Sequence, residues 1–182
     1  MSTYSPNDFL SPSFVIRREQ IELLRQVEMV RAAYALFTDL RPLAPSKIPL
    51  WGAWESETYE LTVVAKAFVY EAATLRQLVV DVARRYPQFA RDAAEGLEAF
   101  DGAFPGLVLL RNSQAHLDER LNHSSRGRPL GARISPPHVV GLTIQATAED
   151  GGHSSISIGP EQIEASEQLL ATMFRSISGA AT

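Results

Sequence analysis

The sequence predicts a mainly α-helical protein, a bundle of four or five helices with a small antiparallel β-hairpin before the C-terminal helix. Apolar residues recur at intervals of three and four along several long stretches, which is the pattern of amphipathic helices. Two β-rich stretches flank a turn signal shortly before the last helical pattern. The chain has 182 residues, 45% of them hydrophobic, and no cysteine, so one domain can bury a sufficient core without disulfides.

The N-terminal part is expected to contain an arm, a helix and a loop. Residues 1–13 are rich in Ser, Pro and Asn, which predicts a flexible arm, and residues 14–182 are expected to form a single helical-bundle domain. Residues 16–40 alternate apolar and charged positions at helical spacing, which predicts an amphipathic helix. Three prolines and a glycine in residues 41–56 exclude a long helix and predict a connecting loop.

The helix predicted over residues 57–86 is apolar on most of its circumference, which places it at the centre of the bundle. Glu71 stands alone within its apolar run. Two interpretations of Glu71 stay open: a buried partner that orients Arg111, or a charge at the edge of the bundle.

Two further helices and a loop are predicted next. Residues 88–100 are expected to form a short helix that the Asp-Gly pair at 101–102 closes. Residues 107–122 predict a helix whose first turn is apolar and whose remainder is polar. Residues 123–138 are rich in Gly, Pro and Arg, which predicts a mobile loop.

The C-terminal part predicts the hairpin and the last helix. Residues 139–147 and 154–158 are β-rich, and the Asp-Gly pair at 150–151 between them is a hairpin signal. Residues 159–161 place a proline and an acid in the first turn of a helix that runs to about residue 177.

Charge and hydropathy narrow the functional classes. The net charge of −4 argues against a broad, field-driven grip on nucleic acid, although a local basic site remains compatible with it. The most apolar stretch, residues 61–83, contains four charged side chains, so no membrane span is expected. The N-terminus lacks the pattern of a secretory signal, and we expect a cytoplasmic protein. We also expect no cofactor, since no nucleotide-binding glycine pattern is present.

The helix predicted over residues 107–122 carries the strongest functional motif. Arg111 and His116 are separated by four residues, and the polar Asn112 follows the arginine. This arrangement resembles the motif of the HEPN superfamily, in which Arg, four to six residues and then His mark the active site of small helical-bundle ribonucleases. The resemblance covers about six residues of the chain.

Arg133 and His138 have the same spacing. The two prolines at 136–137 lie between them and exclude a helix, so the required context is missing.

The resemblance implies a ribonuclease or a degenerate RNA-binding relative. For a ribonuclease it implies RNA cleavage without a metal ion, in which the ribose 2′-hydroxyl attacks the adjacent phosphate. His116 would transfer a proton and Arg111 would stabilise the pentacoordinate phosphate, while Asn112 would orient one of these groups. One motif supplies one histidine, so the family's pairing of two motifs implies a homodimer. Three arginines of the following loop are expected to add a local RNA clamp: Arg126, Arg128 and Arg133.

Two other interpretations of this segment stay open. Arg111 on a solvated face and His116 bonded to a buried carbonyl would have only structural roles. On an ideal helix, side chains five residues apart point in directions that differ by roughly 140°. Arg111 and His116 therefore converge only if the helix is distorted or Arg111 reaches around it.

The second of these interpretations is a metal site, which would draw its ligands from two helices. Its residues would be Asn112, His116, Glu119, His123, Glu60, Glu71 and Asp81.

The alternative function is that of a non-catalytic helical-bundle interaction protein. A protein partner would bind through Trp51 and Trp54 or through residues 126–133. For the two tryptophans, a lid over one end of the bundle is the competing interpretation.

Overall fold

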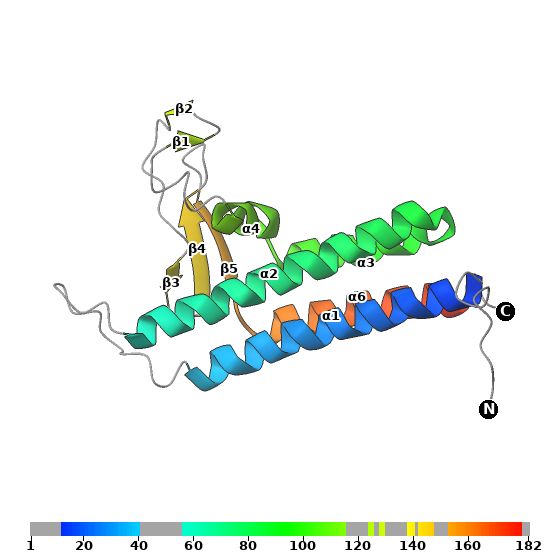
Figure 1. The fold of residues 1–182 in the computed structure, drawn as a ribbon, viewed down its shortest axis with the longest axis horizontal. Coiled ribbons are helices and arrows are strands. Elements are labelled where there is room, and N and C mark those ends of the chain that lie inside the picture. The colour runs from blue at the N-terminus through cyan, green and yellow to red at the C-terminus, as the bar shows by residue number, and fades with distance from the viewer. Residues whose placement is uncertain are drawn as a thin grey trace.

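The structure of the protein is a computed structural model (Figure 1). It describes residues 12–40, 56–115, 124–125, 128–129, 138–140, 142–147 and 153–179. Over these residues the protein is mainly helical, with five α-helices and a small antiparallel sheet before the C-terminal helix, as the sequence predicts.

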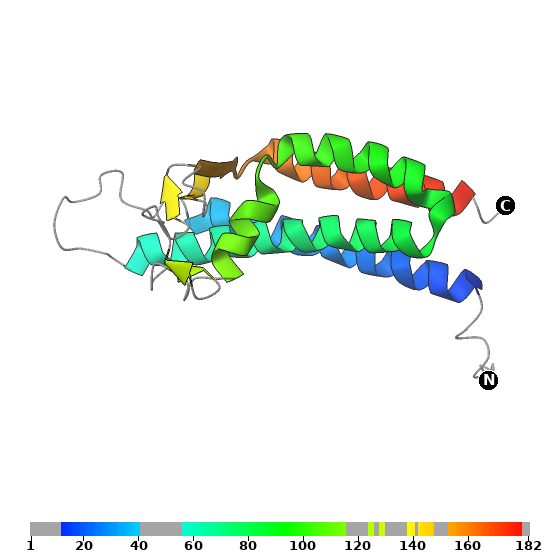
Figure 2. The same ribbon diagram turned by 90° about the horizontal axis from the view of Figure 1, so that it is seen from above.

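Four helices form a bundle of two layers (Figure 2). One layer contains α1 (Pro12–Leu40) and α2 (Ser56–Arg85), and the other contains α3 (Ala90–Ala103) and α6 (Pro160–Gly179). A fifth, short helix, α4 (Leu107–Ala115), crosses α2 near the sheet. None of the helices in the described part of the chain has the length and apolar character needed to span a membrane.

The helix boundaries follow from local chemistry. α1 begins at Pro12, before the predicted start at residue 16, because proline suits the first turn of a helix. α2 agrees with its predicted range to within one residue at each end. A 3-10 turn, η3 (Pro87–Phe89), precedes α3.

The prediction that residues 101–102 close α3 was wrong. Both residues are helical, and Asp101 accepts hydrogen bonds from Arg76 of α2, which holds the last turn against its neighbour. The chain turns instead at Gly106, whose φ of 76° lies in the region that glycine adopts without strain. A Cβ at Gly106 would overlap the hydroxyl of Ser154, so α4 approaches the sheet closely here.

The sheet contains β3 (His138–Val140), β4 (Thr143–Thr147) and β5 (His153–Ser157) in that spatial order, all antiparallel. The predicted hairpin is β4 and β5, in which Ile144 lies opposite Ile156. Residues 139–147 do not form one strand, because β3 and β4 pair with each other as antiparallel strands.

The loop predicted over residues 123–138 contains a short hairpin among its described residues. Within it, β1 (Ser124–Ser125) pairs with β2 (Arg128–Pro129). The two strands are only two residues apart in sequence, and one of these is a glycine, which favours a tight antiparallel turn.

The core runs along α2 and continues under the sheet. α2 buries one side chain on almost every turn, including Phe68, Leu75 and Val79. Ile144 and Ile156 extend the same core from one face of the sheet. Each fully buried side chain of this size contributes about 1.5–3 kcal/mol, so this continuous core holds α4 and the sheet in place beside α2.

Candidate active site

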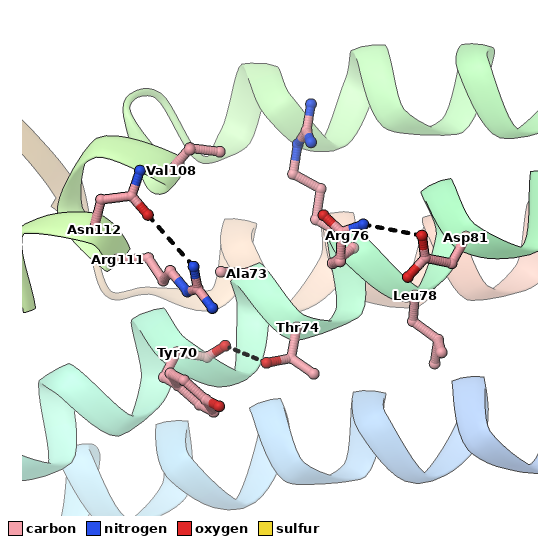
Figure 3. A pocket seen from close by; sticks show the side chains of 10 residues that line it. Tyr70, Ala73, Thr74, Arg76, Leu78, Asp81, Val108, Arg111 and Asn112 are labelled. Carbon is pink, nitrogen blue, oxygen red and sulfur yellow. Dashed lines mark hydrogen bonds between the residues drawn. The ribbon is translucent and has the colours of Figure 1, made fainter. Parts of the chain in front are cut away.

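A groove of about 340 Å³ lies between α2 and α4 (Figure 3). Its polar lining comes from the outer face of α2 and from the exposed face of α4. The residues that matter for its chemistry are Tyr70, Thr74, Gln77, Asp81, Arg111 and Asn112.

The spacing of the α2 residues explains why they share one wall. Tyr70, Thr74, Gln77 and Asp81 follow one another at intervals of four, three and four, which keeps them on one side of a helix. Ala72 and the other buried positions of α2 point to the opposite side. The groove therefore uses the solvent face of a helix whose other face forms the core.

Arg111 is exposed on α4, and its guanidinium lies over α2 beside Tyr70, Ala73 and Thr74 (Figure 3). Its Nη1 donates a long hydrogen bond of 3.4 Å to Oδ1 of Asn112. It forms no salt bridge with any residue that the structure describes. Arg111 and Asn112 thus come together at the groove, and the guanidinium keeps donors available for an anion.

The other predicted site residues are not placed by the described structure. α4 is described up to Ala115, so His116 lies just outside the described residues. Arg126 and Arg133 lie outside them as well, and only the backbone of Arg128 is described, in β2. Trp51 and Trp54 also fall outside the described ranges.

Glu71 is not the partner of Arg111. Its carboxylate accepts a hydrogen bond of 2.6 Å from Nε2 of Gln26, and its backbone carbonyl accepts a second, of 3.0 Å, from the same amide. Glu71 is half-buried and faces α1 rather than α4. Of the two interpretations of Glu71, the charge at the edge of the bundle fits, and its carboxylate is hydrogen-bonded to the amide of Gln26.

Arg76 lines the same groove but its charge is already compensated. Nε and Nη2 donate hydrogen bonds of 2.7 and 2.8 Å to the two carboxylate oxygens of Asp101 on α3. These bonds raise the pKa of the Arg76 guanidinium further above its ordinary value. Of the two arginines that line the groove, Arg111 is therefore the one suited to bind a ligand anion.

Asp81 closes the far end of the groove. Its Oδ1 accepts hydrogen bonds from Nε2 of Gln77 at 3.1 Å and from Nη1 of Arg84 at 3.4 Å. No side chain in the described part of the protein donates a hydrogen bond to Oδ2. One carboxylate oxygen is thus left to accept a bond from a ligand.

The described residues do not assemble a metal site. Among them, no group of three or more His, Asp or Glu side chains is arranged to hold a metal ion. Glu71 and Asp81 instead bind amides of Gln26 and Gln77. Three of the ligands that a metal site would need lie outside the described ranges: His116, Glu119 and His123.

Sequence reasoning missed the α2 wall of the groove. Its polar residues are typical of a solvated face, and only the position of α4 turns that face into a groove. The sequence signal for this wall was the spacing of Tyr70, Gln77 and Asp81, which places the three side chains on one side of the helix.

Comparison of the chain with protein-family models, with curated proteins and with solved structures gives no match.

Proposed function

We propose that this chain is a HEPN-like, metal-independent ribonuclease that acts as a homodimer in the cytoplasm. The observation that carries the proposal is the position of Arg111 and Asn112, which share the exposed face of α4 at a groove. His116 is the residue that follows the described part of this helix. The motif that resembles the superfamily therefore begins on the wall of a groove that is open to a ligand.

The chemistry needs no group from outside the protein. The 2′-oxygen of a ribose attacks the adjacent phosphorus, the bond from phosphorus to the 5′-oxygen of the next nucleotide breaks, and a 2′,3′-cyclic phosphate and a 5′-hydroxyl result. Arg111 donates hydrogen bonds to the non-bridging oxygens, whose negative charge grows in the transition state. His116 accepts the proton of the 2′-hydroxyl as a general base.

A homodimer completes the proton balance. The departing 5′-oxygen needs a proton, and His116 of one copy supplies only one proton-transfer group. A second copy of the same motif places another histidine at the phosphate, so one imidazole accepts a proton while the other donates one. This is the reason to propose a dimer with two facing α4 helices.

The test is cleavage of total RNA and of tRNA in EDTA by the wild-type protein, His116→Ala and Arg111→Ala. Cleavage by the wild type is expected to fall by about two to three orders of magnitude on loss of either side chain, as for removal of one transition-state donor. Arg91→Ala removes an exposed arginine of α3 and is the matched control, with wild-type activity expected.

Thermal unfolding must show that each variant is folded. Absence of cleavage by the folded wild type, or an unchanged rate for His116→Ala, would reject the nuclease.

A non-catalytic interaction protein is the second candidate, and one observation favours it. Several large apolar side chains are exposed on α1 and α4, among them Ile21, which is 63% exposed, Leu36 and Leu109. Such side chains bind other proteins when they form a continuous patch. In that case a cellular phenotype would survive His116→Ala and would be lost on replacing Ile21 and Leu36 by Ser.

A further inference from the structure

We infer that the groove binds two consecutive nucleotides of single-stranded RNA, with the phosphate at Arg111, a guanine base at Asp81 and the neighbouring base stacked on Tyr70. This inference rests on the proposed function and specifies its substrate. It concerns the α2 wall of the groove, which the Arg and His motif does not include.

The order of the residues along α2 sets the length of the bound segment. Tyr70 and Asp81 are eleven residues apart, which corresponds to about 16 Å along a helix. Arg111 lies over α2 between these two positions, beside Ala73 and Thr74 (Figure 3). Residues of α2 therefore line the groove on both sides of a phosphate at Arg111. Each of the two neighbouring nucleotides can place its base in one half of the groove.

The ligand must be single-stranded. Tyr70 and Asp81 line the same groove between α2 and α4, where a base contacts either side chain with its face or its edge once it has left a stack. In an RNA duplex the base edges are paired and its deep major groove is closed to side chains. Unpaired bases of loops and ends can instead be splayed into a groove and recognised there.

Asp81 selects the base by hydrogen-bond chemistry. A carboxylate only accepts hydrogen bonds, and Oδ2 of Asp81 has no donor from the described residues. Guanine carries two adjacent donors, N1–H and N2–H, on its Watson–Crick edge, whereas the other RNA bases lack such a pair. One of these donors can bind Oδ2 and the other Oδ1, which also accepts the bonds from Gln77 and Arg84. Asp81 is paired with Arg84 at 3.4 Å, whereas Arg111 has no carboxylate partner among the described residues, so the phosphate is assigned to Arg111 and a base to Asp81.

Tyr70 supplies affinity without selecting a base. Its side chain is 52% exposed, and it lines the groove at the end opposite Asp81. Stacking on an aromatic ring tolerates any base, because every base has a π-face. The two ends of the groove therefore have different roles, with general binding at Tyr70 and guanine selection at Asp81.

The test is binding of short RNA oligonucleotides, measured by fluorescence anisotropy. The probes are hexanucleotides with a single G, A or C in a U background, and an all-U hexanucleotide. All 2′-hydroxyls are replaced by fluorine, so cleavage cannot start. We expect the G probe to bind about tenfold more tightly than the others, within the range for one bidentate base contact.

The variants separate the two ends of the groove. Asp81→Asn is expected to abolish the preference for G, so that this variant binds the G and U probes equally, while Asp92→Asn, which removes a carboxylate of α3, is expected to keep the preference. Tyr70→Ala is expected to weaken all four probes by about tenfold, and Tyr70→Phe to bind all of them as the wild type does, because the ring is retained. Thermal unfolding confirms that each variant is folded.

Equal binding of all probes, or a G preference that survives Asp81→Asn, would overturn the inference. If the protein cleaves RNA through His116 without any base preference, the proposed nuclease is retained and the guanine site is rejected. A protein that prefers the G probe through Asp81 but cleaves nothing keeps the guanine site and loses the nuclease. A folded protein that neither binds nor cleaves loses both.

Discussion

The arginines that link helices of the four-helix bundle differ from Arg111 on α4 in their hydrogen-bond partners. In the bundle, three arginines are paired with carboxylates on neighbouring helices. These pairs are Arg31 with Glu167, Arg85 with Glu19 and Arg76 with Asp101. On α4, the partner of Arg111 among the described residues is the amide of Asn112. Paired arginines join helices at the rim of a core, whereas an arginine without a carboxylate partner at a groove is suited to bind a ligand.

The same two regions also differ in how they are held together. The bundle buries side chains between two layers, with α2 in contact with α1 and α3. α4 is only nine residues long and rests on α2 and the sheet through Leu107 and Leu110. A substitution in the bundle should therefore change stability most, and a substitution near α4 should change the site most.

Leu169→Ala tests the stability of the bundle and has the largest expected effect. Leu169 is 1% exposed and lies against α3, where a Cβ on Gly96 would be 2.9 Å from its Cδ1. We expect a loss of about 2–5 kcal/mol in the free energy of unfolding, measured with urea. Leu170→Ala, at the half-buried neighbour, is the control and should lose clearly less. Equal losses would show that the layers of the bundle are not closely packed.

Gly106→Ala tests how α4 is held against the sheet. The φ of 76° at Gly106 costs an alanine about 1–2 kcal/mol, and its Cβ would displace the hydroxyl of Ser154. We expect a modest loss of stability together with a much larger loss of RNA cleavage, because Arg111 moves with α4.

Gly102→Ala is the matched control for this prediction. Gly102 lies in a helix with nothing within 4 Å of its Cβ position, so alanine should stabilise the protein by roughly 0.5–1 kcal/mol. Full activity of Gly106→Ala would show that the site does not depend on the position of α4.

Asp101→Asn tests the difference between the two arginines of the groove and has the smallest expected effect on stability. The pair is partly exposed, so its loss should cost about 1 kcal/mol or less. Arg76 would then add a charge to the groove, and we expect tighter binding of the all-U oligonucleotide. Unchanged RNA binding would show that the ion pair between Arg76 and Asp101 does not affect ligand binding in the groove.

The pH dependence of the stability loss in Asp101→Asn follows from the raised pKa of Arg76. Its hydrogen bonds to Asp101 raise the pKa of Arg76, so deprotonation of the guanidinium removes this stabilisation only above the ordinary pKa of arginine. The stability difference between wild type and Asp101→Asn should therefore stay constant from about pH 6 to about pH 9. A difference that changes with pH in this interval would assign the effect to another group.

The bundle was largely predictable from the sequence because its signals are local. Apolar periodicity placed α2 to within one residue, and the proline and acid at 160–161 placed the start of α6. The end of α3 was not predictable in this way. Asp101 and Gly102 favour a turn, but the contact of Asp101 with Arg76 on another helix keeps both residues helical.

The site was predictable only in part, for the same physical reason. Arg111 and Asn112 belong to a local motif that the sequence shows directly. The groove depends on where α4 crosses α2, and that crossing is set by Gly106 and the core under the sheet. Tyr70 and Asp81 therefore gain their significance only from tertiary structure.

The arrangement of the helices determines how the protein can be attached to a surface or fused to another domain. α1 begins at Pro12 and α6 ends at Gly179, and both positions lie at the end of the bundle opposite the sheet (Figures 1 and 2). A tether at either position would therefore leave the groove facing the solution. Two chains tethered in this way on one support would keep both α4 helices exposed to the solution and to each other.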